Sequence, residues 1–155
     1  MTRTETSWIQ YGPYLAFGTA LTAMLGSLYY SEVAGFVPCA LCWYQRILMY
    51  PLVLILLVGI LKQDRGVFDY VLPFSVAGMV LSTYHYLIQL GLIGHPAVCS
   101  VGIPCGLRYV SYFGFVTIPL MALVAFTIIT GVVARARWAS KSARAVSPLL
   151  EQATE

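Results

Sequence analysis

The spacing of charged residues constrains the fold of this chain more than any other feature. No charge lies between Glu5 and Glu32, and a single arginine, Arg46, interrupts the apolar stretch that follows. Two further uncharged stretches cover residues 70–107 and 109–134. A membrane-spanning helix needs about 20 mostly apolar residues, because the hydrocarbon core is about 30 Å thick. Each stretch is therefore long enough for at least one span.

We expect an all-α integral membrane protein, a bundle of four transmembrane helices. Residues 70–107 are too many for one span, and Gly91, Gly94 and Pro96 end the helix there. We expect the first helix to be retained, because its apolar run exceeds the roughly 7–15 residues of a signal peptide and lacks a small-residue cleavage pattern. The predicted helices cover about residues 12–31, 43–61, 70–93 and 111–134, within a membrane domain (1–137) that a cytoplasmic tail (138–155) follows.

The composition excludes several classes of protein. Hydrophobic residues make up 59% and charged residues 10% of the 155 residues, and the mean hydropathy is +0.80. Typical soluble domains contain roughly 45–50% hydrophobic residues and about 25% charged residues. So little polar surface excludes a soluble enzyme, a disordered protein and a DNA-binding module. We therefore expect contact with membrane lipid and no nucleic-acid partner.

Lysine and arginine gather on one side of the predicted bundle, and cytoplasmic loops carry the excess of these residues. Only Arg46 and Arg108 fall on the other side. Both termini are thus predicted to be cytoplasmic, with loops around 32–42 and 94–110 outside. In a bacterium, all four cysteines would then face the extracytoplasmic side of the inner membrane, where disulfides persist. The residues on the predicted cytoplasmic side are Arg3, Lys62, Arg65, Arg135, Arg137, Lys141 and Arg144.

The cysteines form two pairs. Cys39 and Cys42 are spaced i and i+3 at the predicted start of the second helix, where one turn brings two sulfurs close together. Thiolates are favoured at a helix N-terminus by the helix dipole and by unpaired backbone N–H groups. A tight bridge there is easily reduced, because the reduced form is stabilised. Cys99 and Cys105 form the second pair, in a short loop.

Three polar side chains in the predicted helices are candidate ligand contacts. Arg46 lies four residues after Cys42 on the same helix face. A charge inside a membrane helix is costly and indicates function; beside a cysteine it would favour the thiolate and stabilise an anionic partner such as reduced quinone. The alternative is that Arg46 extends to the nearby interface. His85 and Gln89 share one face of the third helix, where they bind a ligand, each other or a neighbouring helix.

Redox chemistry is one of four interpretations of the cysteines. The others are structural disulfides that staple the outer loops, a zinc site of four thiolates, and a soft-metal transporter. The zinc site is disfavoured because the second pair is spaced more widely than the usual two to four residues. A CxxC at an outer helix start, with a second outer pair in a four-helix protein, favours redox chemistry, and no metal is expected as a cofactor.

The cysteine motif and its placement resemble a known family. The segment 39–46 resembles the signature of the DsbB disulfide bond formation proteins, and it reads Cys-Ala-Leu-Cys-Trp-Tyr-Gln-Arg. Two further segments look most like the BdbC branch of that family: 84–89, Tyr-His-Tyr-Leu-Ile-Gln, and 113–119, Phe-Gly-Phe-Val-Thr-Ile-Pro. The resemblance covers about residues 12–134. It implies a membrane thiol oxidoreductase that reoxidises a secreted thioredoxin-like oxidase of the DsbA or BdbD type and passes electrons to quinone.

The resemblance also implies roles for the cysteines. Cys39 and Cys42 would be the pair next to the quinone, which is ubiquinone or menaquinone, and Cys99 and Cys105 the pair that exchanges with the partner oxidase. The partner's thiolate would attack at Cys99. Cys105 would then engage Cys39, which frees Cys42 as the thiolate that meets the quinone.

Arg46 matches the family's arginine on the quinone side, and His85 matches its histidine near the quinone ring. One departure concerns the second pair: enterobacterial members have tens of residues between these cysteines, and here only five intervene. A short loop favours a compact partner contact at Cys99. A rival family, the vitamin K epoxide reductase type, carries its quinone-side CxxC after the loop pair. That order is the reverse of the order in this chain.

Overall fold

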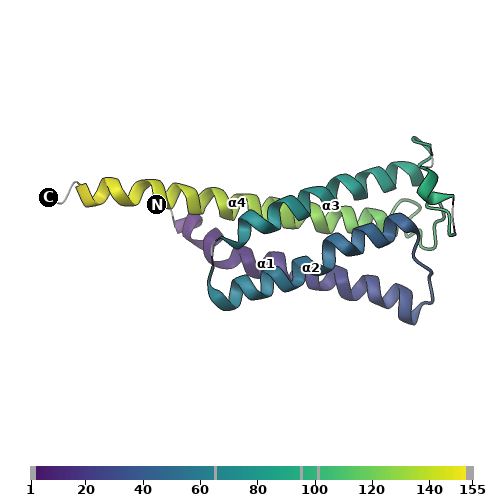
Figure 1. Ribbon diagram of the computed structural model, residues 1–155, viewed down its shortest axis with the longest axis horizontal. Coiled ribbons are helices and arrows are strands. Elements are labelled where there is room, and N and C mark those ends of the chain that lie inside the picture. Colours follow the sequence, from purple (N-terminus) through teal and green to yellow (C-terminus); the bar gives the residue numbers. More distant parts are fainter. Residues whose placement is uncertain (1–2, 65, 95, 101, 153–155) are drawn as a thin grey trace.

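The computed structural model describes residues 3–64, 66–94, 96–100 and 102–152. Within these residues the chain is helical apart from its connections, and it forms no β-strand (Figure 1). The all-helical expectation and the four long helices are therefore confirmed. The elements are α1 (Arg3–Leu28), the π-helical turn η1 (Tyr29–Val33), α2 (Ala40–Lys62), α3 (Val67–Gln89), the 3₁₀ turn η2 (Ala97–Cys99) and α4 (Ile118–Gln152).

Three of these helices are long and apolar enough to cross a membrane. They are α2, α3 and the segment Ile118–Ser142 of α4. The start of α4 lies later than the predicted residue 111, because the preceding segment folds into a tight turn. Phe113 and Gly114 have positive φ angles there, and backbone hydrogen bonds join Tyr112 to Val116. At its other end α4 continues as one helix into the segment predicted as a tail.

The four long helices pack as a closed bundle, in which α1 and α3 each contact both α2 and α4. Its main core contains the fully buried side chains of Leu52, Val71 and Phe126. Gly78 allows α3 and α4 to approach closely, since a Cβ atom there would collide with the Phe126 ring. The α1–α2 and α3–α4 connections lie at the same end of the bundle, and α4 extends beyond the other end (Figure 1).

Candidate functional site

Cys39 and Cys42 begin α2. Cys39 is the N-cap residue with an extended backbone, and its sulfur accepts a hydrogen bond from the Cys42 backbone N–H at 3.3 Å. The two Sγ atoms lie 2.7 Å apart and are not bonded to each other. The structure thus places this pair on one helical turn, as the spacing predicts, with the sulfurs close enough for a disulfide to form after a small movement.

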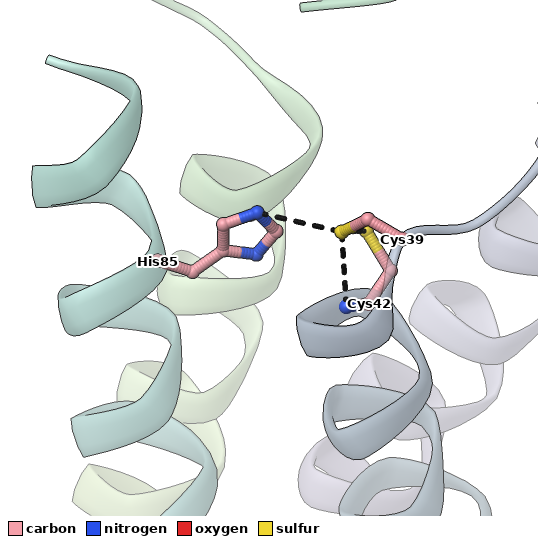
Figure 2. Close-up of side chains that lie close together, drawn as sticks. All are labelled: Cys39, Cys42 and His85. Atoms are coloured by element: carbon pink, nitrogen blue, oxygen red, sulfur yellow. Dashed lines mark hydrogen bonds between the residues drawn. The ribbon is translucent and has the colours of Figure 1, made fainter. Parts of the chain in front are cut away.

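His85 of the neighbouring helix α3 faces this pair (Figure 2). Its Nε2 atom lies 3.7 Å from Cys39 Sγ and 3.1 Å from the backbone oxygen of Cys105. A carbonyl oxygen can only accept, so Nε2–H is the donor in that bond. The ring is 1% exposed, and its Nδ1 atom has no hydrogen-bond partner within the described residues. His85 therefore connects the first cysteine pair to the backbone of the second.

The surroundings of Cys39, which lies just outside the α2 span, favour its thiolate. A hydrogen bond from the Cys42 thiol and the contact with His85 lower the pKa of Cys39 to about 4, although burial acts in the opposite direction. An ordinary cysteine has a pKa of about 8.5. Cys39 is therefore the thiolate of the reduced pair. In the exchange that the family resemblance implies, Cys39 is instead bonded to Cys105 and Cys42 is the free thiolate. That is a different redox state of the protein.

A pH titration checks this assignment. In the reduced Cys99→Ser/Cys105→Ser variant, we expect thiolate absorbance to stay constant from pH 8 to pH 6 and to fall near pH 4. The absorbance should fall only at low pH, because the pKa of Cys39 is lowered. The thiolate persists above this pKa and is protonated only as the pH falls through it. The added Cys39→Ser change should remove this low-pH transition. A midpoint of this transition above pH 7 in the Cys99→Ser/Cys105→Ser variant would contradict the assignment.

The second pair lies beside the first. Cys99 and Cys105 form a disulfide with an S–S distance of 1.99 Å, and both residues are buried. Cys99 ends η2, and the two cysteines share a small apolar cluster with Cys39, Leu41 and Ile88. Both pairs therefore occupy one end of the bundle, within a single packed cluster.

Arg46 is held against α1. Its Nε and Nη2 atoms donate to the hydroxyl and the backbone oxygen of Ser27, both at 3.0 Å. Its guanidinium carbon lies 5.3 Å from the centre of the Trp43 ring. No carboxylate pairs with Arg46 in the part of the chain that the structure describes. The role of Ser27 had no signal in the sequence, because the contact depends on how α1 and α2 pack.

His85 and Gln89 share one face of α3, as predicted, but they do not bond each other. The Gln89 side chain donates to the backbone oxygen of Leu107 at 3.2 Å, as His85 does to Cys105. Arg108 in turn donates to the backbone oxygen of Gln89. This face of α3 thus holds the loop that carries the second cysteine pair. Arg108 was visible in the sequence as the second basic residue on the predicted outer side, but no role was assigned to it.

Gln45 is a buried polar residue of the site that the sequence interpretation did not select. Its side-chain amide donates to Ser82 Oγ at 2.9 Å, and both residues are buried. Gln45 lies one turn beyond Cys42 in α2, and Ser82 lies one turn before His85 in α3. Their hydrogen bond therefore fixes the spacing of the two helices directly beneath the contact between cysteine and histidine.

A cavity of about 730 Å³ adjoins these residues. Its wall is mainly apolar and includes both residues of the first cysteine pair. None of the described residues that line it is acidic. Ligand pockets in proteins commonly measure about 300–1,000 Å³ and combine apolar walls with a few polar groups. The other polar residues of the site that line it are Ser27, Gln45, Arg46, His85, Gln89 and Arg108.

Comparison with known proteins gives one consistent family. The model of the family described as "Disulfide bond formation protein DsbB" matches residues 11–139. The "Probable disulfide formation protein C" of Halalkalibacterium halodurans is 57% identical over 112 residues, which are 72% of this chain and 82% of that protein. The "Disulfide bond formation protein C" of Bacillus subtilis is 52% identical over 118 residues, which are 75% of this chain and 85% of that protein. No solved structure matches the chain.

Proposed function

The chain belongs to the DsbB family of disulfide bond formation proteins, and from this premise we propose that it reoxidises an extracytoplasmic thioredoxin-like oxidase at the expense of membrane quinone. The family makes it a membrane disulfide oxidoreductase. The observation that carries the proposal is the meeting of two cysteine pairs in one cluster beside an apolar cavity. Such an arrangement lets thiol exchange and electron delivery take place at adjoining positions.

The proposed topology has four spans in the bacterial inner membrane, with both termini in the cytoplasm. Three apolar helices and the packing of α1 against two of them support this number of spans. The common placement of both cysteine-bearing connections at one end of the bundle supports a shared extracytoplasmic face. The excess of lysine and arginine at the opposite ends of the helices supports the same orientation. Arg65, which contributes to this excess, lies outside the described residues.

The proposed exchange begins at the second pair. A thiolate of the partner oxidase attacks Cys99 Sγ, the bond between Cys99 and Cys105 breaks, and Cys105 takes the released electron pair as a thiolate. In one route, the partner's second thiol then displaces Cys99, which completes the partner's disulfide and leaves the second pair reduced. In a second route, Cys105 first attacks Cys39 of the oxidised first pair. In the latter route the Cys39–Cys42 bond breaks and Cys42 becomes a thiolate at the cavity wall. The shared cluster of Cys39 and Cys105 supports transfer between the pairs.

The cavity has chemistry suited to a quinone head group. The buried atoms His85 Nδ1 and Gln89 Oε1 have no hydrogen-bond partner within the described residues, and both side chains line the cavity. Arg46 adds positive charge to a wall without described acidic residues, which favours a ligand that gains negative charge. We therefore propose that Arg46, His85 and Gln89 hold the head group. When bound, a quinone would accept two electrons and two protons.

Trapping of the partner tests the role of the second pair. A Cys105→Ser variant leaves Cys99 as a thiol without its bonding partner. Its thiolate can attack the disulfide of an oxidised partner, which forms a mixed disulfide at Cys99 and releases the partner's other sulfur as a thiolate. We expect this variant to accumulate a covalent complex with a thioredoxin-fold oxidase, seen as a band that reductant removes on a non-reducing gel. The matched Cys99→Ser variant should accumulate far less. Equal trapping by the two variants would contradict attack at Cys99.

A further inference from the structure

Two sulfurs and one imidazole converge at the start of α2. The ligand atoms of Cys39, Cys42 and His85 all lie within 4.8 Å of one another, and Figure 2 shows the three side chains facing one another. We propose that these residues, once the cysteine pair is reduced, form a binding site for a zinc-class divalent cation. The site is distinct from the four-cysteine zinc site considered from the sequence, because it uses His85 and neither cysteine of the second pair.

The distances suit such a cation after one small rearrangement. Tetrahedral zinc, with bonds of about 2.3 Å to sulfur and about 2.0 Å to nitrogen, places these two atoms about 3.5 Å apart. Cys39 Sγ and His85 Nε2 are 3.7 Å apart. The two sulfurs, 2.7 Å apart, must separate by roughly 1 Å to reach tetrahedral spacing. Rotation of the Cys42 side chain, which lies at the cavity wall, can provide that movement.

The charge of the site also favours a divalent cation. Two thiolates neutralise a 2+ ion, and a neutral site avoids the large cost of burying net charge in apolar surroundings. A singly charged ion such as Cu⁺ would leave one negative charge uncompensated. The Cys42 backbone N–H already donates to the Cys39 sulfur and can continue to do so when that sulfur binds a metal. Three protein ligands leave the fourth position open, as in other three-ligand zinc sites.

His85 can ligate the ion as a neutral ring. Binding through Nε2 requires the proton of that atom to be carried on Nδ1 instead. Nδ1 is buried and has no hydrogen-bond partner within the described residues, so no bond at Nδ1 prevents it from taking the proton. The bond from Nε2 to the Cys105 backbone oxygen must be released. Metal binding therefore competes with the attachment of the second loop to α3.

The oxidation state of the cysteine pair controls this site. The oxidised pair has no thiolates and lacks two of the three ligands, so it should not bind the ion. Binding to the reduced pair displaces any thiol proton to solvent and transfers no electrons. On the proposed function, a bound ion would also hold both sulfurs away from disulfide exchange. Metal binding itself requires neither quinone nor a partner oxidase.

Cadmium is a suitable probe, because its bonds to thiolates give a charge-transfer absorption. The full-length Cys99→Ser/Cys105→Ser variant, reduced and in detergent, would be titrated with Cd²⁺, and Zn²⁺ would then compete for the site. We expect one ion per chain. A further Cys42→Ser change should remove the absorption, and oxidation of the remaining pair should prevent it from forming.

The decisive comparison is between two positions of α3. His85→Ala should weaken cadmium binding by about tenfold or more, in line with losing a group that supports a metal site. Thr83→Ala, two residues earlier in α3, should leave the affinity unchanged, because the exposed Thr83 hydroxyl donates to the Met79 backbone oxygen within the same helix. Circular dichroism checks that both variants remain helical. Equal affinity of His85→Ala and the parent would overturn the proposal, as would equal binding to the oxidised protein. Neither result would bear on quinone reduction.

Discussion

A Cys42→Ser variant is expected to lose at least about 10³-fold of its quinone-reduction rate, on the scale of losing an active-site nucleophile. A serine hydroxyl cannot form a disulfide with Cys39 or be released as a thiolate at the cavity wall. Electrons that arrive from the second pair could therefore not be passed on to quinone. The measurement is the initial rate of quinol formation by purified protein in the presence of a reduced thioredoxin-fold oxidase.

The second cysteine pair provides the internal control for this variant. Cys99 and Cys105 are bonded to each other, and Cys42 takes no part in that bridge. Before reduced partner is added, alkylation followed by mass measurement should therefore still find these two cysteines oxidised in the Cys42→Ser protein. Full quinone turnover in this variant would show that the first pair is not the route to the cavity.

An Arg46→Gln variant is expected to lose about 10²-fold in kcat/KM for quinone, similar to the loss of one preorganised donor at a site of developing charge. The variant removes a positive charge from a cavity wall that has no described acidic residue. Arg46→Lys restores the charge but not the two-point contact with Ser27, so we expect an intermediate rate. Steady-state kinetics at varied quinone concentration measures the effect.

The step at which Arg46→Gln fails separates a role at the cavity from a structural role. Formation of the mixed disulfide with the partner oxidase should proceed at the parental rate, because the Cys99–Cys105 disulfide remains intact in this variant. Parental kinetics at both steps would instead support an arginine that only extends to the membrane interface. Equal slowing of both steps would indicate a damaged fold.

The helices could be predicted from charge spacing, but their ends could not. Uncharged stretches mark the apolar part of a membrane helix, whereas the helical backbone of α1 and α4 continues into polar sequence. The start of α4 was predicted too early, because residues 111–117 are uncharged like the apolar helix that follows. Phe113 adopts a positive φ angle in the turn there, a conformation that is uncommon for a bulky residue and that composition does not reveal.

In the site, too, the features that depend on local spacing could be predicted, and those that depend on packing between helices could not. Local spacing predicted that Cys39 and Cys42 share a turn and that His85 and Gln89 share a face. The contact of His85 with Cys39, and its bond to the second loop, depend on how α2, α3 and that loop pack together. Residue spacing along a single helix contains no such information.

The most direct test of the central claim is the stoichiometry of electron transfer. Reduced thioredoxin-fold oxidase and quinone would be mixed with a catalytic amount of the protein, and the partner disulfide and the quinol would be measured together. We predict one quinol for each partner disulfide, over many turnovers, with ubiquinone or menaquinone as acceptor. The yield should fall to background when either cysteine pair is replaced by serine. Partner oxidation without quinol, or no turnover with either quinone, would contradict electron flow from the partner through the cysteines to the membrane.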